Sequence, residues 1–486
     1  MKKLKALILF AIFFLSGCSS INKPQISLAG PRSINVFLGG SYSDPGVKAY
    51  DREDGDISNM LIIDDSNLNL HAVGSYQIIY YVYNSKKVRS AAINRTVNVI
   101  QKPAYIDELS NAGFFDPLSM QIKKFRLPAD YQLIRIGKSG RYQTIKEALD
   151  HITGDETAVL ELLDPVHIEN RIKINKNVII KSENGSKVIL KASDDINRPR
   201  GRMFIIGEEA DVTLYNLEIC NANPIDEKRW GGVALNYGIL RMYNCRFYDN
   251  QANGGGVVYN IAGKVYASDC RFSNNLGDRN GPAGHICGSG GVIKNTEDGI
   301  ITLINSTFDN NKSLGKGGAV HSSCSGTITA VNCSFYRNHA NSRGGALNSK
   351  NKMNIVHCTF LENSSDGKDI KDGMPGGGIS LRGEGMLYLS SSIFSNNKGN
   401  DIVLRQDGKI FYNQYNIISD NSLQSIRKAD LTMKFLDMDG IGICAPGKNE
   451  IETGIIPPDF TLIMRDQRGV LRNGLVDAGA YESSQE

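Results

Sequence analysis

The stretch CRFYDNQANGGGVVYN at residues 245–260 contains a pattern that recurs along the chain. Phe247 and Asn250 form a Phe-x-x-Asn motif, and a Gly-Gly pair followed by two apolar residues begins five residues later. The Phe-x-x-Asn motif returns at 272–275, 308–311, 335–338, 360–363 and 394–397. Successive motifs are 25, 36, 27, 25 and 34 residues apart, so the base period is near 25 with additional residues in some turns. Such a period predicts a solenoid, in which each coil completes the core of its neighbours by stacking on them.

Apolar residues occupy two columns upstream of the repeated Phe, two positions apart. This period of two predicts strands whose apolar side chains face one core. An Asn or Asp follows in most repeats, and these residues tolerate the left-handed backbone of a sharp bend. The two columns hold Leu240, Val265, Ile301, Ile328, Met353 and Leu387, and then Met242, Ala267, Leu303, Ala330, Ile355 and Leu389; the bend holds Asn244, Asp269, Asn305 and Asn332, with His357 and Ser391 as departures.

Four of the nine cysteines share one position of the repeat. Ser306 and Ser392 fill that position in other coils, so it is predicted to be a buried ladder of small side chains rather than a disulfide framework. The Asn of each Phe-x-x-Asn motif is expected at a second bend, where stacked amides bond from coil to coil. The sequence contains no Cys-x-x-Cys or other zinc-ligand spacing. The four cysteines are Cys245, Cys270, Cys333 and Cys358.

A short amphipathic helix is predicted within residues 140–152, where Thr144 and Glu147 form a capping box. A helix followed by many short apolar runs is typical of a parallel β-helix whose open end is capped. We therefore predict an all-β chain with a right-handed parallel β-helix over 134–420 and a C-terminal coil and cap over 421–486. Residues 102–133 are predicted to be a linker.

Residues 25–101 are predicted to form a separate β-sandwich, because alternating apolar residues are divided by turn signals. The blocks GGSYSDPGVKAYDREDGDIS (39–58), VGSYQIIYYVYN (73–84) and NRTVNVI (94–100) resemble the bacterial surface Ig-like domain. That resemblance implies a spacer. The acidic loop at 51–56 is the one candidate for Ca²⁺, but its spacing does not fit an EF-hand, so no cofactor is predicted.

The alternating Phe-x-x-Asn and Gly-Gly-apolar motifs over residues 210–400 resemble the repeats of polymorphic outer-membrane proteins, a family of β-helical surface adhesins. The stretch DQRGVLRNGLVDAGAYE at 466–482 is similar to the terminal signature of bacterial right-handed β-helix surface proteins. Members of the first family usually continue into a membrane barrel. Here a lipid anchor is expected to hold the protein instead.

The expected anchor lies at the N-terminus. Residues 1–17 combine early lysines with the apolar run ALILFAIFFL and are predicted to be a signal peptide. Leu15-Ser16-Gly17-Cys18 resembles a lipobox, which implies lipidation of Cys18 and a tether over 18–24. Ser19 favours the outer membrane over the inner one, with the periplasmic or outer side left open. Without the signal lysines the chain has 52 basic and 51 acidic residues, a balance that gives no steering toward nucleic acid.

Loops of variable length lie between the Phe-x-x-Asn and Gly-Gly motifs, so they are expected to leave from one edge of the solenoid. The longest are 222–230, 276–289 and 364–376. They and their neighbours carry aromatic and charged side chains, which are suited to sugar rings and uronate carboxylates. Solvated polar loops are the plain alternative. The candidate ligand-binding residues are Arg229, Trp230, Asp278, Arg279, His285, Arg343, Asp366 and Lys368.

The sequence favours a lipid-anchored surface protein whose β-helix binds a glycan or a host or neighbouring surface, as adhesins do. A polysaccharide lyase or glycoside hydrolase acting on an acidic polysaccharide is the first alternative, and a structural envelope protein is the second. Arg171-Ile172-Lys173 and Gly284-His285 are superficially similar to polygalacturonase motifs, but their order is wrong and the required aspartates are missing. No catalytic residue is therefore assigned.

Overall fold

The computed structural model describes residues 23–30, 32–102, 105–113, 115–116, 121–153, 156–183, 186–192, 201–224, 229–278, 288–368, 375–390, 392–414 and 417–418, with four short strands after them. The chain forms two compact units, Met1–Pro103 and Ala104–Glu486. Their regular secondary structure is almost all strand, which confirms the predicted all-β class.

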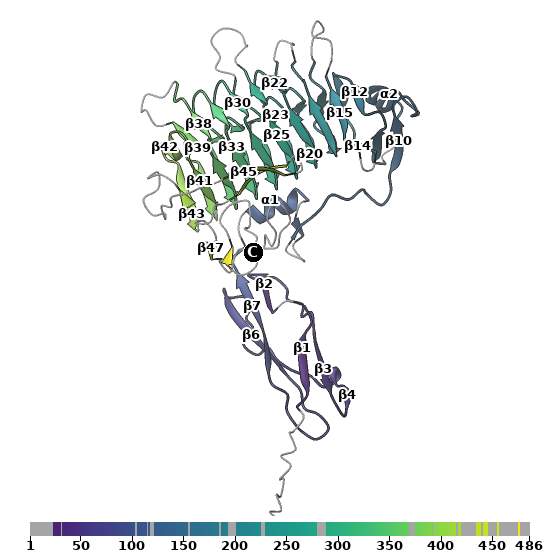
Figure 1. Ribbon diagram of the computed structural model, residues 1–486, viewed down its shortest axis with the longest axis vertical. Helices are drawn as coiled ribbons and strands as arrows, with labels where there is room; N and C mark the ends of the chain where they lie inside the picture. The colour runs from purple at the N-terminus through teal and green to yellow at the C-terminus, as the bar shows by residue number, and fades with distance from the viewer. Residues whose placement is uncertain are drawn as a thin grey trace, which may run out of the picture. The chain divides into compact units, whose positions relative to one another are not determined.

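The first unit is a sandwich of two small sheets (Figure 1). Its core holds Val36, Ile78, Tyr80 and Val97, all buried. The three-stranded sheet has the order β1(Gln25–Leu28), β3(Val47–Asp51), β4(Gly55–Asp56), and the four-stranded sheet has the order β2(Ser33–Phe37), β7(Ile93–Ile100), β6(Gly74–Tyr81), β5(Ile62–Asp64); a 3₁₀ turn covers Ser58–Met60. The predicted Ig-like sandwich is thereby confirmed.

The second unit is a parallel β-helix, as predicted. Three long parallel sheets run along it, and each coil adds one strand to each sheet (Figure 1). The eleven-stranded sheet contains β10(Gln132–Ile136), β11(Ala158–Leu162), β14(Val178–Ser182), β17(Asp211–Tyr215), β20(Ile239–Tyr243), β24(Lys264–Ser268), β28(Ile300–Ile304), β32(Thr327–Val331), β36(Met353–Val356), β40(Met386–Ser390) and β43(Lys409–Gln414). The ten-stranded sheet contains β12(Val166–Ile168), β15(Val188–Lys191), β18(Leu217–Cys220), β21(Arg246–Tyr248), β25(Arg271–Ser273), β29(Thr307–Asp309), β33(Ser334–Tyr336), β37(Thr359–Leu361), β41(Ile393–Ser395) and β44(Ile417–Ile418).

The third long sheet and a short fourth sheet close each coil. The nine-stranded sheet contains β13(Ile172–Ile174), β16(Phe204–Ile206), β19(Ala234–Asn236), β23(Val258–Ile261), β27(Ile293–Thr296), β31(Val320–Ser322), β35(Leu347–Ser349), β39(Gly376–Arg382) and β42(Asn400–Arg405). The five-stranded sheet contains β22(Gln251–Ala252), β26(Leu276–Gly277), β30(Lys312–Ser313), β34(His339–Ala340) and β38(Ser364–Ser365). The remaining elements are α1(Tyr105–Asn111), β8(Phe115–Asp116), β9(Gln121–Ile122), α2(Ile145–Asp150), β45(Lys434–Met438), β46(Ile441–Ala445), β47(Gly454–Ile455) and β48(Leu475–Val476).

The repeated Phe residues stack in a continuous column inside the solenoid. Successive ring centroids from Phe247 to Phe394 are 4.5–5.0 Å apart, and the rings are within 13° of parallel. The two apolar columns upstream are completely buried, as predicted. The spacing is close to the roughly 4.8 Å between paired strands, so strand pairing sets the distance between the rings.

The Asn residues of the motif form a second buried column. Asn311 illustrates it: its side-chain Nδ2 donates to Asn338 Oδ1 at 2.9 Å and to the carbonyl of Phe272 at 2.9 Å. Its Oδ1 accepts from both the main-chain N–H and the side-chain amide of Asn275, each at 3.0 Å. The amide ladder is confirmed. The left-handed residue of this bend is the one before the Asn, for example Asn310 with φ of 54°.

The Gly-Gly pair is required by close backbone contacts. Gly255 has φ of 61°, and a Cβ on it would lie 1.9 Å from the carbonyl oxygen of Val258. A Cβ on Gly256 would lie 2.2 Å from the carbonyl oxygen of Gly291 in the next coil. Any larger side chain at these positions forces the coils apart. The pairs in neighbouring coils show the same contacts.

The repeated cysteines are buried and reduced, which confirms the predicted ladder of small side chains. Ser306 Oγ accepts from the main-chain N–H of Cys270 at 3.1 Å, so Ser and Cys take the same place in the column. Burial raises the pKa of Cys270 and Cys333 well above the ordinary thiol value. These thiols are therefore structural and unreactive.

Helix α2 lies at the start of the solenoid. Thr144 caps it by accepting from Glu147 N at 3.1 Å, and the Glu147 carboxylate accepts from Gln143 N at 2.9 Å. Glu169 also accepts from the first helical N–H groups, Ile145 N at 2.7 Å and that of the next residue at 3.2 Å. Burial raises the pKa of Glu169. The predicted capping pattern is confirmed, with one bond shifted by a residue.

Part of the segment predicted as a linker lies along the eleven-stranded sheet (Figure 1). We call the described residues between 105 and 125 the strap. The Glu108 carboxylate accepts from Lys352 Nζ at 2.8 Å, from Asn354 Nδ2 at 2.8 Å and from the Thr329 hydroxyl. This one side chain therefore ties α1 to β32 and β36.

The strap then follows the sheet toward the first coils. Arg241 donates to the carbonyl of Ala112 at 2.7 Å. The Phe125 ring packs against Tyr215 and Tyr243, with centroids 4.8 and 4.7 Å away. Outward-facing residues in the middle of this sheet are buried, among them Tyr266, Thr302, Thr329 and Asn354. Strand β46, which pairs with β45, contacts β29 and β33 of the ten-stranded sheet.

Candidate functional site

The five-stranded sheet marks the edge from which the variable loops leave. We call this sheet and its loops the loop edge. Its strands are in parallel register, so one outward position repeats in every coil. A further bridge pairs Ser364 with Lys398. The resulting column, here called the edge column, contains in order Gln251, Leu276, Lys312, His339, Ser364 and Lys398.

His339 lies at the centre of a polar cluster on this edge. Its Nδ1 is 2.9 Å from Ser364 Oγ, and its Nε2 is 3.2 Å from Asn341 Oδ1 and 3.6 Å from Asp366 Oδ2. A neutral ring protonated at Nε2 satisfies both contacts, because Nδ1 then accepts from the serine hydroxyl. Lys368 Nζ lies 3.3 Å from the same Asp366 oxygen. The imidazole, carboxylate and ammonium are all partly open to solvent.

Arg229 and Asp278 meet in a second cluster, with Nη2 and Oδ2 3.3 Å apart. Asp278 is buried and also accepts from the Gln251 amide. Arg229 donates to the carbonyl of Pro224 at 3.1 Å and to Asn223 Oδ1 at 3.3 Å. The pair therefore holds the loop before the Gly-Gly motif against the next coils. A buried carboxylate in such a contact is not presented to a ligand.

Trp230 stacks on Tyr259, with centroids 4.6 Å apart and rings 10° from parallel. Tyr259 belongs to β23, so the indole lies over the nine-stranded sheet. Arg202 fixes the main chain beneath it by donating to the carbonyl of Trp230 at 2.7 Å. One face of the indole is thus occupied by the tyrosine ring.

The remaining predicted residues are not brought into one cluster. Arg343 is half-buried in the turn after β34, and its carbonyl accepts from the N–H of Gly317. Arg279 and His285 lie outside the described residues. Asp366 and Lys368 are in contact with each other near His339, as described above. The described members of the predicted set therefore divide between two clusters, the Trp230 stack and the turn that holds Arg343.

The edge column includes exposed residues that the predicted set omits, chiefly Lys312 and Lys398. A simple signal identifies them, because each member of the column directly follows the Asn of a Phe-x-x-Asn motif. That Asn is buried at the bend, so the next side chain must point outward. The position directly after each Phe-x-x-Asn motif therefore identifies the edge column in the sequence.

His321 is buried and has a structural role. Its Nδ1 is 3.3 Å from the carbonyl of Asn348, and burial, with Lys294 and Lys316 nearby, lowers its pKa well below the usual value. It is neutral in the folded protein. Cys324, three residues later, is exposed in a left-handed turn.

In the part of the chain that the structure describes, no three or more His, Cys, Asp or Glu side chains gather closely enough to hold a metal ion. The acidic loop of the first unit shows how its carboxylates are used. Asp51 accepts from the N–H groups of Glu53 and Asp54 at 2.9 and 3.2 Å, and these bonds help to lower its pKa. Asp54 accepts from Ser85. Through these contacts the carboxylates of the loop stabilise a tight turn.

Comparisons with known proteins agree with this two-part architecture. The family model of the bacterial surface protein Ig-like domain matches residues 26–99. The model of the Chlamydia polymorphic membrane protein repeat matches residues 305–323, which span one Phe-x-x-Asn and Gly-Gly pair. By their descriptions, both families point to the cell surface or outer membrane. The structure contains no helix, among the residues it describes, that is long and apolar enough to cross a membrane.

Two solved structures are similar to parts of the chain. The lipoprotein BT2262 from Bacteroides thetaiotaomicron is 25% identical over 17% of this chain and 39% of that chain, with a TM-score of 0.15. Pectate lyase Pel9A is 11% identical over 74% of this chain and 98% of that chain, with a TM-score of 0.34. Neither likeness is close enough to transfer a function. No curated protein matches the chain.

Proposed function

We propose that this is a lipid-anchored surface protein that binds an acidic glycan through its loop edge. The observation that carries the proposal is the edge column, in which Lys312, His339, Ser364 and Lys398 occupy consecutive coils on one exposed edge. Strand pairing sets the coils about 4.8 Å apart. A polymer lying along the solenoid would therefore meet a polar or cationic group on each of these coils.

The charges of the edge column favour an anionic ligand. Lys312 and Lys398 are exposed, and neither is in an ion pair with a described residue. Lys368 adds a third ammonium near His339, and its only described carboxylate contact is Asp366. Ammonium groups act as point charges toward carboxylates or sulfates, while the histidine, serine and asparagine of the cluster can bond to sugar hydroxyls.

The test is binding of the chain without residues 1–18 to immobilised polygalacturonate and alginate, with dextran as a neutral reference. Lys312→Gln and Lys398→Gln are expected to weaken binding about threefold to tenfold each, since every lost contact to a charged group removes roughly 1 kcal/mol. Binding should also weaken with added salt. Lys350→Gln, an exposed lysine outside the column, is the matched control.

Unchanged binding by the Lys312→Gln/Lys398→Gln double variant would show that the edge column is not the site. Equal loss of dextran binding and of acidic-polymer binding in this double variant would contradict the proposed ligand class. The anchor is tested separately: Cys18→Ser should move the protein from the membrane fraction to the soluble fraction, and an unchanged distribution would refute lipidation at this residue.

Cleavage of the bound polysaccharide is a second candidate function, because His339 contacts a hydroxyl on one side and a carboxylate and amide on the other. A histidine oriented in this way is suited to act as a general base. Incubation with polygalacturonate or alginate should then release unsaturated products, and His339→Gln should abolish them. Absence of products from the unaltered chain would leave binding as the function.

A further inference from the structure

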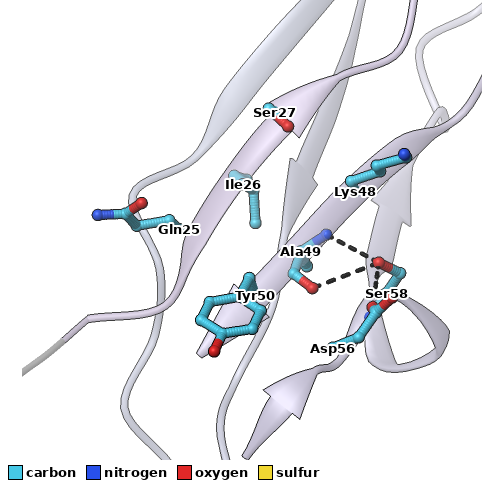
Figure 2. Close-up of a pocket in the computed structure, with 8 residues that line it drawn as sticks. All are labelled: Gln25, Ile26, Ser27, Lys48, Ala49, Tyr50, Asp56 and Ser58. Carbon is cyan, nitrogen blue, oxygen red and sulfur yellow. Dashed lines mark hydrogen bonds between the residues drawn. The ribbon is translucent and has the colours of Figure 1, made fainter. Parts of the chain in front are cut away.

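The outer face of the three-stranded sheet in the first unit carries a hollow of about 250 Å³ (Figure 2). Tyr50 is its most prominent side chain and is 60% exposed. Gln25 and Asp56 lie directly opposite Tyr50 on the two neighbouring strands, β1 and β4. Lys48 and Ser27 are paired one step further along the same face. The sheet thus presents an open aromatic ring between an amide and a carboxylate.

The base of this hollow is held rigidly. Ser58 Oγ accepts from the N–H of Ala49 at 2.9 Å and donates to Asp56 Oδ1 at 2.6 Å. The N–H of Ser58 also donates to Asp56 Oδ1, at 2.9 Å, and these two bonds lower the pKa of Asp56. Asp56 is therefore ionised at neutral pH, with one carboxylate oxygen engaged. No other described residue bonds to its second oxygen, which points to that oxygen as an acceptor for a ligand.

The fold itself does not need a tyrosine at position 50. The side chains of Ala49 and Asp51, on either side of it, are buried, so the alternation of the strand turns Tyr50 outward. Ile26, Leu28, Val47 and Ala49 supply apolar contacts of this sheet to the core. An exposed tyrosine contributes little to stability, and its apolar ring remains in contact with water.

We propose that this face of the first unit binds a neutral sugar residue, with the pyranose ring stacked on Tyr50. The C–H face of a sugar is apolar and its rim carries hydroxyls, so an open aromatic ring flanked by a few polar groups matches it. The Gln25 amide and the Asp56 carboxylate lie on opposite sides of the ring and bond to the hydroxyls. Lys48 and Asp56 have opposite charges, and the carboxylate beside the ring disfavours a uronate.

This site lies in a different unit from the loop edge and is proposed for a different ligand class. Each of the two proposals can therefore be refuted without the other. The probe is a set of immobilised neutral polymers, mannan, galactan and glucan, bound by the chain without residues 1–18. Tyr50→Ala is expected to weaken binding to at least one of them about tenfold or more, which is the effect of removing an aromatic anchor. Tyr50→Phe should keep most of the binding, because the stacking surface remains.

Tyr83→Ala is the matched control, since Tyr83 is also an exposed tyrosine of the first unit and lies outside the hollow. Thermal unfolding of Tyr50→Ala should be unchanged, which separates loss of binding from loss of structure. Absence of binding to all three neutral polymers, or equal binding by Tyr50→Ala, would overturn the proposal. Loss of neutral binding in the Lys312→Gln/Lys398→Gln variant but not in Tyr50→Ala would assign neutral glycans to the loop edge instead.

Discussion

The repeated residues and the variable residues that follow them have different environments in each coil. Phe247 and Asn250 are completely buried, whereas the next residue, Gln251, is partly open to solvent. The Asn250 side chain pairs two main-chain groups of the preceding coil, the carbonyl of Ile219 and the N–H of Ala222, and these groups lie where water cannot reach them. The repeated Asn therefore supplies partners to buried backbone groups. The residue directly after it has no such role and varies from coil to coil.

Asn311→Ala tests this role at a single position. The change removes four side-chain hydrogen bonds, two of which pair buried main-chain groups, the N–H of Asn275 and the carbonyl of Phe272. We expect the free energy of unfolding of the β-helix to fall by on the order of 3 kcal/mol. The only tryptophan of the chain, Trp230, lies in this unit, so its fluorescence during urea unfolding reports the β-helix and not the first unit.

The control for this prediction is Asn310→Ala, one residue earlier. Asn310 is exposed and left-handed, and its side chain makes only a long bond to Asp309 among the described residues, so its replacement should cost about 1 kcal/mol, chiefly from backbone strain. A fall for Asn311→Ala no larger than that of Asn310→Ala would mean that the amide ladder does not stabilise the solenoid.

At the scale of elements, local patterns predicted the strands well because their period is short. The inward columns, the stacked Phe residues and the cap at Thr144 all depend on neighbours within one or two coils. The strap could not be predicted in this way. Glu108 contacts Thr329 and Asn354, which are 221 and 246 residues away, and nothing in the irregular segment itself indicates that partner. The edge column could have been predicted from the sequence, since its position follows from that of the buried Asn.

Glu108→Ala tests whether the strap is part of the folded β-helix. Removal of the carboxylate leaves Lys352, Asn354 and Thr329 without their shared acceptor, at a cost of roughly 2 to 3 kcal/mol. The strap should then detach at a lower denaturant concentration than in the unaltered chain, before the sheet unfolds. Limited proteolysis should show faster cleavage between residues 105 and 126. Glu209→Ala, an exposed carboxylate of the same unit, is the control, and equal cleavage rates in both variants would contradict this role.

At the scale of the whole molecule, the two proposals place one glycan site on each compact unit. Two sites in one chain raise the effective concentration of the second site once the first is occupied, provided that both can engage together. The predicted ligand classes differ: a neutral sugar at Tyr50 and an acidic one at the edge column. A surface that contains both kinds of sugar should therefore hold the protein longer than a surface with either kind alone.

Surface plasmon resonance on films of mannan or galactan mixed with alginate measures this effect. We expect dissociation from the mixed film to be about tenfold slower or more than from either single film, because both contacts must open before the protein leaves. Tyr50→Ala and Lys312→Gln should each return the rate on the mixed film toward that of a single film, and Tyr83→Ala should not. A mixed-film rate equal to that of the slower single film would show that the two units do not bind at the same time.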